Sequence, residues 1–221
     1  ARAAAACAAE AAGMVSDGAP VAYALCRPPG HHATPAGYGG SCYLNNAGVA
    51  VEGLLTGDVG RVAVIDLDAH HGNGTEAIFY ERQDVLYGSV HVDPGAGWFP
   101  HLVGYADETG AGAGAGATRN LPLPEGTGDD DWLEGVADLV GWVGQAGCDA
   151  LVVSLGVDAA ADDPESPLLV TSAGYHRAGA LLGATGLPAV VVQEGGYHLP
   201  TLGGLVGAYL DGHASSLSGA S

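Results

Sequence analysis

Three side chains in two segments of the chain have the types and spacing of a catalytic zinc site. Asp68 and His70 stand two residues apart in an extended apolar run, so their side chains would point to the same face, and Asp158 ends another such run. Two carboxylates and one imidazole leave the fourth position of a tetrahedral zinc ion open, which is the catalytic pattern. Alone, each is more readily explained as a capping aspartate or a strand-end histidine. The tandem pair His31–His32 favours the metal centre instead.

The elements that must position these residues follow from runs of apolar, β-branched residues. Five continuous runs predict strands buried on both faces of a parallel sheet: 21–26, 61–68, 85–93, 150–158 and 188–193. Segments with helical character stand between them or near them: 1–13, 46–55, 74–82, 129–145 and 172–184. Alternation of strand and helix predicts an α/β fold, a mostly parallel sheet with helices on both faces. The glycine-rich tract 108–120 is predicted to be a loop, either a flexible linker or an ordered loop beside a site.

Each predicted strand ends in polar residues. The endings are RPPGHH, DLDAHHGNGT, SVHVD, SLGVD and QEGGY. Ligands of open α/β sheets bind outside the carboxyl ends of the strands. We therefore expect the active site at that edge of the sheet.

Composition limits the classes of partner. The 221 residues predict one domain, and hydrophobic residues make up 48%, enough for a core. The net charge of −19 excludes a basic nucleic-acid surface and electrostatic attachment to anionic lipid. No apolar run approaches the ~20 residues of a membrane span. Four cysteines without a CxxC pair predict reduced thiols in a cytoplasmic protein.

Four ordered motifs resemble the zinc-dependent histone deacetylase and acetylpolyamine amidohydrolase family, within which SLGVD and residues 93–116 are most similar to the bacterial acetylpolyamine amidohydrolases. The four motifs are RPPGHHA (27–33), DLDAHHGNGT (66–75), SLGVDAAADDP (154–164) and EGGY (194–197), and the resemblance extends from about residue 19 to residue 212. It implies the arginase–deacetylase fold and a single deacetylase-type catalytic domain over residues 1–221. Relatives carry a longer N-terminal region, so we expect the chain to lack the N-terminal part of the family domain.

The resemblance also implies roles for individual residues. Zinc ligands would be Asp68, His70 and Asp158, and the catalytic set would be His31, His32, Tyr197, Asp66 (partner of His31) and Asn73 (partner of His32). A structural potassium ion would lie near Asp66, Asp68 and His70, with Ser89 and Val90 completing its site. A second monovalent site would use carbonyl groups around Phe79, Arg82 and Val85. His32 is the favoured general base and His31 the favoured charged neighbour, although the sequence alone does not decide between them.

Two glycines argue against a binuclear site. The arginase family shares this fold class by resemblance, and its two-manganese site needs an aspartate two residues after the D-x-H pair and a D-x-D in the later strand. Those positions are Gly72 and Gly156 here. The sequence therefore favours one zinc ion and amide hydrolysis over guanidine hydrolysis.

The expected substrate is a small cationic acetylated amine. Phe99 matches the aromatic residue that forms one wall of the family's substrate tunnel. The facing wall is aromatic in most relatives, but this chain has Ser41 there. Trp98, beside Phe99, either compensates for the missing aromatic ring or only packs at the rim of the tunnel. Glu165 coincides in position with a gatekeeper glutamate, at the tunnel mouth, of a polyamine-preferring deacetylase. The alternative is that Glu165 is an ordinary solvated loop residue. Gly40 and Gly195 complete the expected substrate-contacting set. Alternatives are a protein acetyl-lysine deacetylase and a non-catalytic remnant that binds metal or polyamine. A homodimer is possible.

Overall fold

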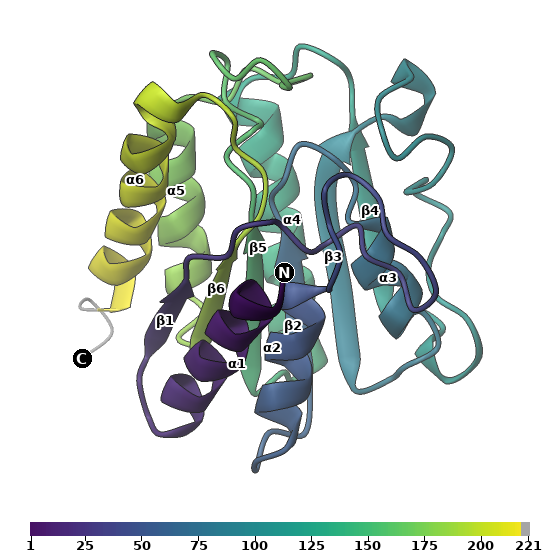
Figure 1. Ribbon diagram of the computed structural model, residues 1–221, viewed down its shortest axis with the longest axis vertical. Helices are drawn as coiled ribbons and strands as arrows, with labels where there is room; N and C mark the ends of the chain where they lie inside the picture. Colours follow the sequence, from purple (N-terminus) through teal and green to yellow (C-terminus); the bar gives the residue numbers. More distant parts are fainter. Residues whose placement is uncertain (218–221) are drawn as a thin grey trace.

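Six parallel strands form one sheet in the computed structural model, which describes residues 1–217. The strand order is β1-β6-β5-β2-β3-β4 (Figure 1). The bounds are β1 (Val21–Ala24), β2 (Val62–Asp66), β3 (Val85–Val92), β4 (Thr118–Leu123), β5 (Ala150–Leu155) and β6 (Ala189–Gln193). Because every strand is parallel to its neighbours, all six carboxyl ends meet at one edge.

Helices cover both faces of the sheet, as the sequence predicted. On one face lie α1 (Arg2–Ser16), α2 (Asn46–Leu55) and α3 (Asn73–Phe79), and on the other α4 (Asp129–Ala146), α5 (Ser172–Gly183) and α6 (Leu199–Leu217) (Figure 1). Alternate residues of a strand point to opposite faces. In β5, Leu151 and Val153 therefore join the core under α4–α6, while Ala150 and Val152 join the core under α1 and α2.

The predicted strands and helices agree with the structure to within three residues at their ends. Two elements were not predicted. Strand β4 (TRNLPL) begins inside the tract predicted as loop, and it lacks a continuous apolar run because an edge strand is only partly covered. Helix α6 contains four glycines, which weaken its sequence signal. The rest of the tract packs on the end of α3, where the Ala111 N–H donates to the Tyr80 carbonyl, which favours the ordered loop over the linker.

Two sequence expectations on the cysteines and on membrane spans can be compared with the described residues. All four cysteines are free thiols. Among residues 1–217, no helix combines the length and the apolar character that crossing a membrane requires.

Helix α6 carries a buried histidine whose protonation should weaken the fold. His213 is 1% exposed, and neither ring nitrogen has a partner among the described residues. Burial lowers the pKa of His213 below its ordinary 6.5. Between that lowered pKa and about pH 6.5 the unfolded chain binds the proton more readily than the folded chain, so stability falls as pH falls through this window and is recovered above it.

We therefore expect His213→Leu to reduce the drop in melting temperature between pH 7.5 and pH 5.5, measured by differential scanning calorimetry. The matched control is His176→Leu on α5, since His176 is exposed. An equal acid-induced drop in the wild-type protein and in His213→Leu would contradict the expectation.

Candidate metal centre and active site

The three predicted metal ligands converge at the carboxyl ends of β2 and β5. Asp68, His70 and Asp158 are buried, and their ligand atoms all lie within 4.8 Å of one another. The His70 Nδ1 atom is 3.2 Å from both Asp68 Oδ1 and Asp158 Oδ2. Strands β2 and β5 are neighbours, with Asp66 opposite Ser154, so the loops that follow them leave the sheet side by side.

The prediction that alternation along a strand orients these residues was wrong. Strand β2 ends at Asp66 and β5 at Leu155, so all three residues lie in loops and strand alternation does not orient them. Hydrogen bonds to the loop backbone orient them instead. The Ala69 N–H donates to Asp158 Oδ1 at 2.9 Å, and the Gly195 N–H donates to Asp68 Oδ2 at 2.8 Å.

The charges of this cluster suit a divalent cation. Burial and the nearby Asp68 carboxylate raise the pKa of Asp158 to about 6. Burial alone would lower the pKa of His70, but hydrogen bonds to Asp158 and Asp68 raise it to about 10. Two carboxylates forced together in a buried site therefore draw positive charge toward them, and two carboxylate oxygens with one imidazole nitrogen are a donor set that zinc accepts.

The structure explains why Gly72 and Gly156 are glycines. A Cβ atom at Gly72 would lie 2.1 Å from Asp66 Oδ2, and one at Gly156 would lie 2.2 Å from Asp68 Oδ2. No side chain fits at either position without moving these carboxylates. The two positions that would supply the extra carboxylates of a binuclear site are thus closed.

His31 stands beside the cluster as a charged group. Its Nδ1 atom is 3.1 Å from Asp66 Oδ2 and its Nε2 atom is 3.7 Å from Asp68 Oδ2. Burial alone would lower the pKa of His31, but the carboxylates of Asp68 and Asp66 raise it well above its ordinary value. The ring is therefore protonated near neutral pH.

His32 is the neutral member of the pair. Burial and the neighbouring charge of His31 lower the pKa of His32 to about 2. Its Nδ1 atom lies 2.9 Å from Asn73 Oδ1, which can only accept a hydrogen bond, so this contact assigns the proton to Nδ1 and leaves a lone pair on Nε2. The assignment of His32 as the general base and His31 as its charged neighbour stays a prediction.

Tyr197 and four of the six predicted substrate residues meet at a cavity of about 250 Å³. Its lining consists of His32, Gly40, Ser41, His70, Phe99, Glu165 and Tyr197. The Phe99 ring packs edge-on against His32, with ring centres 4.7 Å apart. Burial raises the pKa of Tyr197 above its ordinary value, so its hydroxyl keeps its proton.

Two predicted substrate residues do not line this cavity. The Trp98 ring centre lies 6.0 Å from that of His70, and its indole N–H donates to Glu125 Oε1 at 3.3 Å, so Trp98 lies beside a metal ligand without lining the cavity. Gly195 lies against the metal cluster, where a Cβ atom would come within 2.1 Å of Asp158 Oδ2. Gly195 therefore packs against the metal ligands and is not part of the cavity lining.

The predicted potassium residues lie near one another in two groups. Asp66 and Ser89 are register partners on β2 and β3, and Val90 follows on β3, although the Ser89 hydroxyl is 2.8 Å from His91 Nδ1. Phe79, Arg82 and Val85 lie between the end of α3 and the start of β3, where the Arg82 side chain pairs with Asp84 and Glu52. Both monovalent sites stay predictions.

Sequence reasoning missed the role of Glu194. This buried carboxylate accepts the N–H groups of Gly30 at 2.6 Å and of His31 at 3.1 Å, and so fixes the loop that carries the tandem histidines. Burial raises the pKa of Glu194 to about 7. The signal available was an acidic residue directly after a buried strand (AVVVQ) and directly before Gly195–Gly196.

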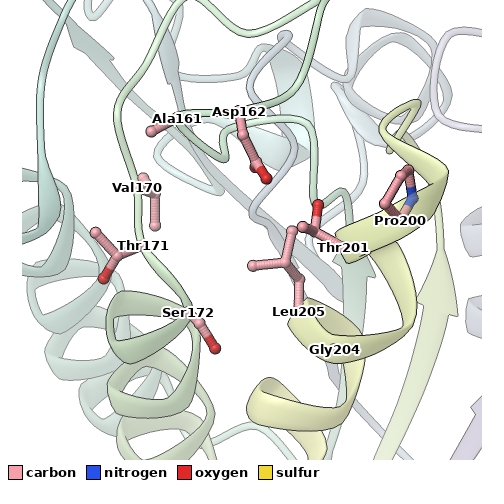
Figure 2. Close-up of a pocket in the computed structure, with 9 residues that line it drawn as sticks. All are labelled: Ala161, Asp162, Val170, Thr171, Ser172, Pro200, Thr201, Gly204 and Leu205. Atoms are coloured by element: carbon pink, nitrogen blue, oxygen red, sulfur yellow. The ribbon is translucent and has the colours of Figure 1, made fainter.

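A larger cavity, of about 550 Å³, lies away from the metal cluster between the first turns of α5 and α6 (Figure 2). Its lining residues are Ala161, Asp162, Val170, Thr171, Ser172, Pro200, Thr201, Gly204 and Leu205. None of them is a metal-cluster or histidine-pair residue. We therefore assign the chemistry to the smaller cavity, although the other cavity has the larger volume.

The sequence matches the histone deacetylase domain family over residues 1–212. The acetylpolyamine amidohydrolase of Burkholderia pseudomallei (strain 1710b) is 50% identical over 192 residues, which are 87% of this chain and 56% of that protein. The acetylpolyamine amidohydrolase of Mycoplana ramosa is 46% identical over 92% of this chain and 59% of that protein.

The fold has matches among solved structures. The crystal structure of the acetylpolyamine aminohydrolase from Burkholderia pseudomallei has a TM-score of 0.93 at 48% identity, over 96% of this chain and 62% of that chain. That of the HDA15 HD domain has a TM-score of 0.88 at 34% identity, over 95% of this chain and 60% of that chain. The chain thus spans less than two thirds of the length of these relatives.

Proposed function

The chain belongs to the histone deacetylase domain family, and on that premise we propose that it is a zinc-dependent deacetylase that releases acetate from acetylated polyamines. One observation carries the proposal. A single cavity is lined by the neutral His32, by Tyr197 and by His70 of the metal cluster. A proton acceptor and a hydrogen-bond donor thus face the same metal centre.

The reaction breaks the amide C–N bond and forms a C–O bond with water. The chemistry that zinc supplies when held by Asp68, His70 and Asp158 is polarisation of the acetyl carbonyl and activation of water. His32 Nε2 accepts the proton that the attacking water loses and transfers it to the leaving amine nitrogen. The Tyr197 hydroxyl donates a hydrogen bond to the carbonyl oxygen as negative charge develops there. His31 stays protonated, and its charge favours the same build-up of negative charge.

The polyamine preference is supported by three observations. Relatives at 46–50% identity are named acetylpolyamine amidohydrolases. Glu165 is exposed and lines the cavity, where its carboxylate can pair with a second ammonium group of the substrate. The net charge of −19 attracts polycations over long distances. Zinc as the metal, a structural potassium ion, a homodimer and a cytoplasmic location belong to the same proposal.

Steady-state kinetics test the proposal. The zinc-loaded protein is assayed on N-acetylated diamines, on acetylated spermidine and on an acetyl-lysine peptide. We expect a higher kcat/KM for the acetylated polyamines. A preference for the peptide would assign the chain to protein deacetylases, and zinc binding without turnover on any substrate would favour the non-catalytic alternative.

Glu165 offers a separate test of substrate preference. We expect Glu165→Gln to raise KM for an acetylated diamine about three- to fivefold, because one exposed charge pair is lost, with kcat unchanged. KM for a neutral N-alkylacetamide should not change. Glu134→Gln, which removes an exposed carboxylate on α4, is the matched control. An equal KM change on the neutral substrate would rule out an electrostatic role.

A further inference from the structure

The Tyr197 side chain lines the cavity without a hydrogen bond that fixes its hydroxyl among the described residues. It is 42% exposed, and its hydroxyl has no hydrogen-bond partner among residues 1–217. The direction of this side chain therefore depends on the backbone that carries it. That backbone includes Gly196, whose φ of +140° lies in a region that suits glycine, so a residue with a side chain would be strained here.

The backbone before Tyr197 is fixed to the metal cluster. The Gly195 N–H donates to Asp68 Oδ2 at 2.8 Å, and the Gly195 carbonyl accepts the Val157 N–H at 2.8 Å. Gly196, which has no side chain of its own to anchor the backbone, stands between this anchor and Tyr197. A second anchor is needed on the far side if Tyr197 is to keep one position.

That second anchor is a buried carboxylate. Asp163 Oδ2 accepts the Tyr197 N–H at 2.7 Å and the His198 N–H at 2.9 Å. Asp163 is 8% exposed, so these bonds are shielded from water. The two N–H groups directly precede α6, and negative charge at a helix N-terminus is favourable, which strengthens the contact.

The same carboxylate also holds the loop that carries Glu165. Asp163 Oδ1 accepts the Glu165 N–H at 3.0 Å. The adjacent Asp162 makes only a surface contact, in which its carboxylate is 3.1 Å from His198 Nδ1. Figure 2 shows Asp162 pointing toward the larger cavity, near Thr201 and Pro200 in the first turn of α6.

We propose that Asp163 is a positioning residue that fixes the Tyr197 hydroxyl at the cavity and joins it to the loop of Glu165. Its role in turnover rests on the proposed deacetylase function, whereas its hold on the Tyr197 and His198 backbone does not. The carboxylate does not line the cavity. It acts through the backbone, and its loss should free Tyr197 without removing any group that contacts the substrate.

Hydrogen–deuterium exchange tests this hold without any assay of activity. In Asp163→Ala we expect the Tyr197 and His198 amides to exchange about ten- to hundredfold faster, because each loses a hydrogen bond to a charged acceptor. Asp163→Asn keeps one acceptor oxygen and should give an intermediate rate. Asp162→Ala removes only the surface contact and should leave both amides protected. Wild-type exchange rates in a folded Asp163→Ala protein would overturn the proposal.

A double-mutant cycle tests whether Asp163 acts through Tyr197. Asp163→Ala should lower kcat for an acetylated diamine about tenfold or more in the wild-type background, with a smaller change in KM, and Asp163→Asn should restore part of it. In the Tyr197→Phe background the same change should cost less than twofold, since the hydroxyl it positions is gone. Fully additive losses would overturn the proposal. If the wild-type protein has no activity, the proposed function fails, and the exchange rates alone decide the role of Asp163.

Discussion

Replacing Tyr197 with phenylalanine is expected to lower kcat for an acetylated diamine about 10²- to 10³-fold, with little change in KM. Tyr197 is the only tyrosine among the residues that line the cavity, and its hydroxyl keeps its proton because burial raises its pKa. A donor aimed at a developing oxyanion is worth a factor of this size, and it contributes mainly in the transition state.

The control for this variant is metal content. Tyr197 is not among the residues of the metal cluster, so zinc bound per chain, measured by atomic emission, should equal the wild-type value. Tyr38→Phe provides a matched control, because Tyr38 is 78% exposed and lies outside the cavity. A loss of less than threefold in Tyr197→Phe would show that the oxyanion is stabilised by other groups.

Replacing Asp158 with asparagine is expected to abolish stoichiometric zinc binding and with it all measurable turnover. Asp158 supplies one of two buried carboxylates in the cluster, and its neutral replacement is a far poorer ligand for a divalent ion. The wild-type protein should gain on the order of 10 °C in melting temperature with zinc at a thousandfold excess over its dissociation constant. The variant should gain nothing.

Asp162→Asn separates this effect from a general loss of negative charge. Asp162 lies four residues farther along the same loop and is exposed. It should bind one zinc ion per chain and show the full thermal shift. A chelator should remove both the activity and the thermal shift of the wild-type protein, and renewed zinc should restore them. Turnover in metal-free protein would contradict the proposed chemistry.

The sequence predicted the residues of the site better than the way they are held. The four motifs contain every member of the metal cluster and the histidine pair, and continuous apolar runs placed them at strand ends. That Asp68 and Asp158 become neighbours depends on β2 pairing with β5, which no local pattern reveals. The orientation of the ligands comes from loop hydrogen bonds, so the argument from strand alternation could not find it.

Glu194 and Asp163 show why the supporting residues were missed. Each carboxylate accepts backbone N–H groups from a segment distant in the sequence: Glu194 from Gly30 and His31, and Asp163 from Tyr197 and His198. A backbone N–H belongs to nearly every residue, so such a bond leaves no mark on the sequence of the donor segment. Side-chain pairs such as His32 with Asn73 do leave one, and that pair was found through the resemblance.

The strand order has a consequence for the way the chain folds. Among residues 1–217, β6 is the last strand in sequence, yet it lies between β1 and β5. Within these residues β1 pairs only with β6, which is made about 165 residues later, and such long-range pairing is slow because of its loop-closure entropy. Residues 194–197 directly follow β6, so the arrival of this strand closes the gap in the sheet and delivers Tyr197 in one event. A nascent chain stopped before β6 would lack Gly195, whose N–H group holds Asp68, so the metal cluster takes its final form only when this strand arrives.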